Sequence, residues 1–143
     1  MLLPITLTLA AACAFLNIWL ASRCGRVRMK AGVLHGDGGN ILLGRRMRAH
    51  ANFAEYAPIV LILFGLVEMA LGTSLWLWLP AFAFLIARVA HGFGMDADRP
   101  TPWRAGGIIV TMLVTVGLAA TALYAAYSAT RDVPAPPAMA AAL

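Results

Sequence analysis

Residues 48–71 read RAHANFAEYAPIVLILFGLVEMAL, and this stretch decides the fold. Its uninterrupted apolar part covers only 57–71, about 15 residues, whereas a helix that spans a bilayer needs roughly 20. The spanning helix must therefore extend backwards through Glu55 and Asn52 towards Arg48. Ionised side chains in a membrane helix usually face a bundle interior or a water-filled cavity, so these polar residues indicate a site.

The composition is that of an integral membrane protein. Of 143 residues, 62% are hydrophobic and 12% are charged, and the mean hydropathy is +0.81. The 11 basic residues exceed the 6 acidic ones, which would also suit a nucleic-acid-binding protein. Their position argues against a nucleic-acid partner, because most lie between the first two apolar segments. Loops rich in Lys and Arg face the cytoplasm, so we expect a multi-pass membrane protein with this basic loop in the cytoplasm. If the host is bacterial, the protein lies in the inner membrane with both termini in the periplasm.

The two cysteines give no sign of a metal site or a disulfide. Cys13 lies inside the first apolar segment and Cys24 just beyond its end, about 16 Å apart along a helix. Neither has a second Cys or a His at metal-ligand spacing. We therefore expect no metal.

Four apolar segments are long enough to span a membrane. They cover about residues 3–21, 47–71, 75–95 and 104–128. They predict an all-α, four-helix membrane bundle that forms one domain over residues 1–129. We expect an irregular hairpin between the first two helices, because this basic connection contains the turn-rich stretch 35–40. The short connection at 72–74 makes the second and third helices antiparallel neighbours. The tail at 130–143 is rich in Pro and Ala and is expected to be disordered.

The second and third helices carry polar residues at matching depth. Arg48, Asn52 and Glu55 have i, i+4, i+7 spacing, so they share one helix face. The third helix runs in the opposite direction and carries Arg88 and His91 at i, i+3. Both groups then lie close to the cytosolic side of the membrane.

Arg104 begins the fourth helix on the same side and completes a polar layer from three helices. The simplest alternative is that Glu55 and Arg88 pair with each other and only hold two helices together. That pair does not explain Asn52 and His91 at the same depth, because each added polar group costs desolvation. The excess of arginines favours a ligand with net negative charge, since guanidinium groups bind carboxylates well.

Other polar and small residues are interpreted as structural. Asn17 is expected to make an interhelical hydrogen bond, His50 to be an interfacial or packing histidine, and Glu68 to reach water near the outer end of its helix. Gly106, Gly107 and Gly117 of the fourth helix permit close helix packing, within one subunit or between subunits.

The sequence resembles one known family in several places. The run RAHANFAEYAP at 48–58, with its R-x-x-x-N-x-x-E pattern, resembles the signature of the MAPEG family, the membrane-associated proteins in eicosanoid and glutathione metabolism. An Asp-Gly-Gly element at 37–39, the ARVAH element at 87–91 and Arg104 after a proline-containing loop follow in the family's order. The resemblance covers about residues 3–128 and points to the small bacterial members.

The resemblance implies a homotrimer that binds glutathione between subunits and uses its thiolate to conjugate, or to reduce, an apolar electrophile from the membrane. Arg104 resembles the catalytic arginine that stabilises the thiolate, because a nearby cation lowers a thiol pKa from about 8.5. The residues that the resemblance assigns to glutathione binding are Arg26 or Arg28, Arg48, Asn52, Glu55, Arg88 and His91. The alternative is a non-catalytic ligand-binding or scaffold protein of the same fold.

The sequence also departs from the family pattern. Gly44 stands where several animal members have a glutamate, and Ala51 stands where they have a basic residue. The tyrosine expected one turn after His91 is absent. These differences argue against eicosanoid chemistry.

Overall fold

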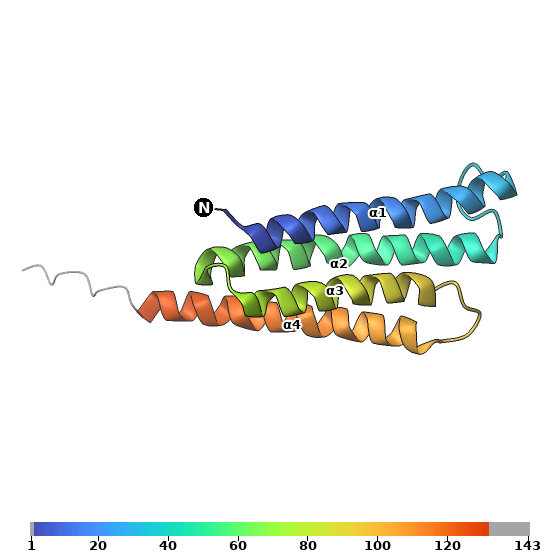
Figure 1. The fold of residues 1–143 in the computed structure, drawn as a ribbon. Coiled ribbons are helices and arrows are strands. Elements are labelled where there is room, and N and C mark those ends of the chain that lie inside the picture. Colours follow the sequence, from blue (N-terminus) through green and yellow to red (C-terminus); the bar gives the residue numbers. More distant parts are fainter. Residues whose placement is uncertain (1, 132–143) are drawn as a thin grey trace, which may run out of the picture.

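The structure, a computed structural model, describes residues 2–131 and folds them into four helices (Figure 1). Their bounds are Pro4–Ala31 for α1, Ile41–Leu71 for α2, Leu75–Gly94 for α3 and Pro102–Arg131 for α4. Residues 2–131 contain no strand, and all four helices are long and apolar enough to cross a membrane. The predicted all-α, four-helix membrane bundle is therefore confirmed.

The helices alternate in direction along the bundle. Figure 1 shows the α1–α2 and α3–α4 connections at one end, and the N-terminal side of α1 with the α2–α3 connection at the other. We call the first of these ends the basic end, because the basic run of the sequence lies there. α1 packs mainly on α2 and α3 mainly on α4. The predicted antiparallel pair of α2 and α3 is present, but α2 contacts α4 more extensively than it contacts α3.

Helix α1 is longer than the predicted 3–21. The basic run does not form the expected irregular hairpin but continues the helix to Ala31. Arg and Lys are good helix formers, and leaving the membrane does not by itself end a helix whose hydrogen bonds are internal. The helix stops at Gly32, whose φ of 64° lies in the left-handed region, and the backbone N–H of Val33 closes the last turn on the Arg28 carbonyl.

Helix α2 also starts earlier than predicted, at Ile41 instead of residue 47. Asn40 caps it, because its side-chain oxygen accepts a hydrogen bond of 2.9 Å from the backbone N–H of Leu43. The whole arginine run of 45–48 is therefore helical. Only 32–40 remains as a connecting loop.

Helix α4 exceeds the predicted 104–128 at both ends. Thr101 caps its start, where the threonine hydroxyl accepts a hydrogen bond from the backbone N–H of Arg104. At the other end the helix includes residues 130 and 131, the first two of the predicted tail. The remainder of that tail lies outside the described residues.

The core lies between α1, α2 and α3 and is closed by α4. Its central side chains are aromatic and branched aliphatic, among them Phe53, Phe64 and Phe84. Gly107 brings α4 close to α3, because a methyl group there would lie 2.6 Å from the carbonyl oxygen of Ala87. The prediction of close packing through small residues is confirmed within the subunit for this glycine.

Glu68 does not reach water as expected but is fully buried. Its carboxylate accepts hydrogen bonds from the backbone N–H groups of Ile5 and Thr6 and from the hydroxyls of Thr6 and Thr73. The first N–H groups of a helix have no partner within that helix. Glu68 supplies partners for two of them and thereby attaches the start of α1 to the end of α2.

Candidate functional site

Arg88 is the most deeply buried charged side chain of the basic half of the bundle. It lies on α3, is 1% exposed, and donates from Nη2 to the side-chain oxygen of Asn52 on α2 at 2.9 Å. Its guanidinium carbon lies 5.7 Å from the ring centre of Phe53 and 6.0 Å from that of Tyr56. Within the described residues, its Nε and Nη1 are buried and have no hydrogen-bond partner.

Arg48 and Glu55 form an ion pair along one face of α2, at 3.6 Å. This pair confirms that the i, i+7 spacing places both side chains on one face. It also shows that the alternative pairing of Glu55 with Arg88 is wrong, because Arg88 bonds to Asn52 and none of the described ion pairs joins it to Glu55. Matching the residues by their depth in the membrane predicted the height of each residue along its helix. It did not predict the direction in which each side chain points around the helix axis.

His91 connects α3 to the start of α4. Its side chain is buried, and its Nδ1 lies 3.0 Å from the backbone carbonyl oxygen of Arg104. Because a carbonyl only accepts, Nδ1 carries the proton of this bond. Gly107 makes the approach possible, since a methyl group there would lie 2.7 Å from Cβ of His91. His91 thus fixes the backbone of Arg104 and is not available through Nδ1 for a ligand.

The Arg104 side chain is exposed, and among residues 2–131 its guanidinium has no hydrogen-bond or ion-pair partner. Its backbone, by contrast, is held on both sides by Thr101 and His91. Arg104 therefore combines a guanidinium that is unpaired within this part of the chain with a backbone that is held in place.

The two candidate arginines of α1 lie in different surroundings. Arg28 donates to the loop carbonyls of Val33 and Leu34, and its Nη2 lies 3.5 Å from Sδ of Met47, the residue before Arg48. Arg26 instead lines a separate cavity between the end of α1 and the start of α2. Arg28 therefore contacts the residue beside Arg48, whereas Arg26 shares its cavity with Leu42 and Arg46.

The two other polar residues of this region behave as expected. Nε2 of His50 lies 2.8 Å from the side-chain oxygen of Asn17, which links α2 to α1. The prediction of an interhelical hydrogen bond for Asn17 is confirmed, and His50 is its partner.

An ion cluster around Asp96 was missed by the sequence analysis. Asp96, just after α3, pairs with Arg23 of α1 at 2.6 Å and with Arg46 of α2 at 2.8 Å. Burial alone would raise the pKa of the Asp96 carboxyl, but the hydrogen bonds and charges of the two arginines hold that pKa below its ordinary value. The sequence did contain a signal for this cluster, because Asp96 follows the third apolar segment on the same side of the membrane as the basic run. The cluster ties three helices together at the basic end.

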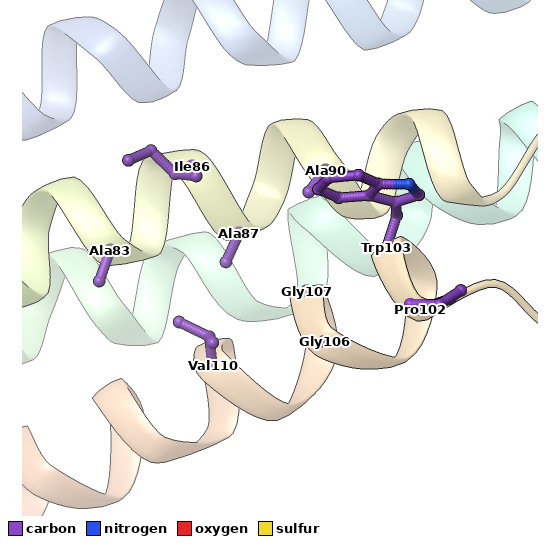
Figure 2. Close-up of a pocket in the computed structure, with 9 residues that line it drawn as sticks. All are labelled: Ala83, Ile86, Ala87, Ala90, Pro102, Trp103, Gly106, Gly107 and Val110. Atoms are coloured by element: carbon purple, nitrogen blue, oxygen red, sulfur yellow. The ribbon is translucent and has the colours of Figure 1, made fainter.

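An apolar groove lies beside the polar layer, between α3 and α4 (Figure 2). It has a volume of about 440 Å³. Its lining residues are Ala83, Ile86, Ala87, Ala90, Pro102, Trp103, Gly106, Gly107 and Val110. Ala87 and Ala90 alternate with Arg88 and His91 on the same turns of α3, so one segment of helix carries both a polar and an apolar surface.

These features define a class of protein: a four-helix membrane protein with an arginine-rich polar layer near one end and an apolar groove beside it. The chain matches the MAPEG family over residues 6–124 and belongs to that family. It is 34% identical over 87 residues to the inner membrane protein YecN of Escherichia coli (strain K12), a match that covers 60% of this chain and 65% of that protein. YecN of a second Escherichia coli strain, O6:H1, matches equally well.

The match covers less than two thirds of the length of these relatives. Family membership supports a membrane function related to glutathione or to lipid metabolism. The four spanning helices and the inner-membrane relatives together support a multi-pass protein of the inner membrane.

Proposed function

We propose that the protein is a membrane-bound glutathione transferase or peroxidase. The observation that carries this proposal is the Arg88 guanidinium, which is buried with two donor nitrogens that lack partners among the described residues. A buried donor without a partner costs about 1–3 kcal/mol, and more when it is charged. A ligand with acceptor oxygens would remove this cost, and glutathione offers two carboxylates.

The charges of the polar layer complement glutathione. Arg48, Arg88 and Arg28 provide positive charge for the two carboxylates, and Glu55 provides a partner for the single ammonium group. Of the two arginines suggested for α1, we assign this role to Arg28, because it contacts Met47, the residue before Arg48. Asn52 orients Arg88 through their hydrogen bond.

Arg104 is the proposed catalytic residue. Its free guanidinium would stabilise the glutathione thiolate and raise the nucleophilic fraction at neutral pH. In conjugation, the thiolate sulfur forms a bond to carbon of the electrophile while a leaving group such as a halide departs with the bonding electrons. In peroxide reduction, the thiolate takes the terminal oxygen of a lipid hydroperoxide, an alcohol leaves, and a second glutathione converts the sulfenic acid to a disulfide with release of water.

The apolar groove between α3 and α4 is the proposed site of the electrophile (Figure 2). Trp103, the neighbour of Arg104, lines its end nearest the polar layer. Its lining is almost entirely apolar, which suits a membrane-dissolved substrate and excludes a charged one. An electrophile in the bilayer would reach the thiolate sideways without crossing water.

The homotrimer that the family resemblance implies would cover exposed polar groups on α2. The side chains of Arg48 and Glu55 are 67% and 51% exposed in the single subunit, within a helix that spans the membrane. Charged groups in a spanning segment are unfavourable against lipid, so a neighbouring subunit and the ligand are expected to cover them. The site would then lie between subunits.

The test is an assay of purified protein with glutathione and either a generic aryl halide or a lipid hydroperoxide. The proposal expects glutathione-dependent turnover above the uncatalysed rate with at least one of the two. Saturable glutathione binding without turnover of either would contradict an enzymatic function.

The second candidate is a ligand-binding or scaffold protein without catalysis. One observation favours it: Met95 occupies the position one turn after His91 and is buried, so no hydroxyl is present there to assist a thiol. Thermal stabilisation by glutathione without turnover would support this candidate.

A further inference from the structure

A second polar cavity lies at the basic end, between the last turns of α1 and the first turn of α2. Its volume is about 540 Å³, within the range of about 300–1,000 Å³ that is typical of ligand sites. It is lined by Arg26, Val27, Lys30, Ala31, Asn40, Leu42 and Arg46. It shares no lining residue with the proposed glutathione site.

The cavity has a strong excess of positive charge. Three of its lining residues are cationic and none is acidic. Among the described residues, Arg26 and Lys30 form no ion pair, and Arg46 shares the single carboxylate of Asp96 with Arg23. Because Arg23 and Arg46 share the one negative charge of Asp96, this group of three residues keeps a net positive charge.

Arg46 is rigidly held at the edge of this cavity. Its Nε and Nη2 donate to the Asp96 carboxylate, and its Nη1 donates to the backbone carbonyl of Arg23 at 3.2 Å. A fixed guanidinium loses little entropy when it binds an anion. The first turn of α2 also carries no acidic residue, so the positive end of this helix adds to the potential.

The cavity lies at the depth of lipid headgroups. The 28 residues of α1 span about 42 Å at 1.5 Å per residue, whereas the hydrocarbon core is about 30 Å thick. About two turns at the end of α1 therefore extend beyond the hydrocarbon. Arg26 and Lys30 lie in these turns.

Exposed apolar side chains are chain neighbours of the residues that line the cavity. Met29 on α1 is 77% exposed and Ile41 at the start of α2 is 69% exposed. Val27 and Leu42 contribute apolar surface inside it. A surface with both properties suits an amphipathic ligand better than a soluble anion, because exposed apolar groups at this depth gain from contact with lipid.

We propose that this cavity binds the phosphate headgroup of an anionic phospholipid. Arg26, Lys30 and Arg46 contact the phosphate, and Val27 and Leu42 contact the glycerol and the first methylenes of the acyl chains. Basic pockets between membrane helices are known to bind such headgroups.

The test compares phosphatidylglycerol with phosphatidylcholine, using the full-length protein in lipid nanodiscs or detergent. Phosphatidylglycerol should raise the melting temperature and remain bound in native mass spectrometry, whereas phosphatidylcholine should do neither. The double variant Arg26→Gln/Lys30→Gln should bind phosphatidylglycerol about thirtyfold more weakly. The control Arg99→Gln/Arg131→Gln removes the same net charge elsewhere and should bind it as the wild type does.

Equal weakening in both double variants would overturn the proposal, because it would show a non-specific charge effect. An equal preference of the wild type for the two lipids would also overturn it. Stabilisation by inorganic phosphate that matches that by phosphatidylglycerol would instead indicate a site for a soluble anion. Circular dichroism of each variant verifies that the helices are retained, so a loss of lipid binding is not mistaken for unfolding.

Discussion

Arg88 of α3 donates to the side-chain oxygen of Asn52 of α2 at 2.9 Å, and among residues 2–131 no ion pair joins this buried cation to an acidic residue. A structural ion pair would have balanced the charge of the arginine. The observed hydrogen bond orients the guanidinium but does not pair it directly with a carboxylate. This arrangement costs stability in the free protein and is suited to an anionic ligand.

Replacing Arg88 with Met should separate a binding role from a structural one. Because a buried charge without compensation is removed and much of the side-chain volume is kept, the melting temperature of the free protein should stay within a few degrees or rise. The stabilisation by glutathione should disappear. Thermal denaturation with and without glutathione measures both effects. A large loss of stability in the free variant would show that Arg88 mainly holds α2 and α3 together.

The glycine pair of α4 offers a matched test of the α3–α4 contact. Gly107→Ala should lower stability by about 1–3 kcal/mol, because the new methyl group would meet the Ala87 carbonyl and Cβ of His91. Gly106→Ala places its methyl group in open space and should be neutral or stabilising, by up to about 1 kcal/mol. Melting temperatures in one detergent compare the two, and equal losses would contradict the described packing.

Asp96 should make stability depend on pH in the acidic range. The pKa of its carboxyl in the folded protein lies below its ordinary value of 3.8. A group with a lowered folded-state pKa stabilises the fold fully above its unfolded-state pKa and loses that contribution as pH falls through the folded-state pKa. The melting temperature should therefore fall as pH drops below about 4.

Asp96→Asn should lower stability at neutral pH and flatten this acid dependence. Asp98→Asn is the control, because Asp98 is exposed and pairs only with Arg45 among the described residues. If the Asp98 variant flattened the profile as strongly, the acid sensitivity would not come from the three-helix cluster.

Glu68 should matter for the start of α1. Glu68→Leu leaves the backbone N–H groups of Ile5 and Thr6 without their acceptor, at an expected cost of about 1–3 kcal/mol. Hydrogen exchange of the first turn of α1 should become faster, while exchange at the end of α1 near Ala31 stays slow. Thr73→Ala removes only one donor to Glu68 and should show a much smaller effect. Unchanged exchange in the first turn would mean that Glu68 does not secure it.

The sequence predicted the transmembrane segments well, because hydropathy reports directly on membrane burial. It underestimated α1 and α2, since hydropathy cannot show that a basic segment stays helical beyond the membrane. The stop of α1 at Gly32 depends on backbone conformation, and the start of α2 depends on a side-chain cap at Asn40. From the sequence alone, Gly32 and Asn40 indicated only a turn and not the residues at which the helices end and begin.

The candidate site was predictable in its depth but not in its pairing. The spacing of Arg48 and Glu55 predicted their shared face, and the structure pairs them. Whether Arg88 contacts Glu55 or Asn52 depends on how α3 is rotated relative to α2. The spacing of residues within one helix does not predict this rotation. The contacts of Asp96 and Glu68 join residues far apart in the chain, and such contacts follow only from the packed bundle.

The most direct test of the central claim is a glutathione titration of the purified protein at neutral pH, followed by thiolate absorbance. The wild type should show a saturable thiolate signal, and Arg104→Gln should lose most of that signal while it still binds glutathione. The pH at which bound thiol ionises should rise in the variant, because the stabilising cation is gone. Absence of saturable binding to the wild type, or an undiminished thiolate signal in Arg104→Gln, would contradict the account.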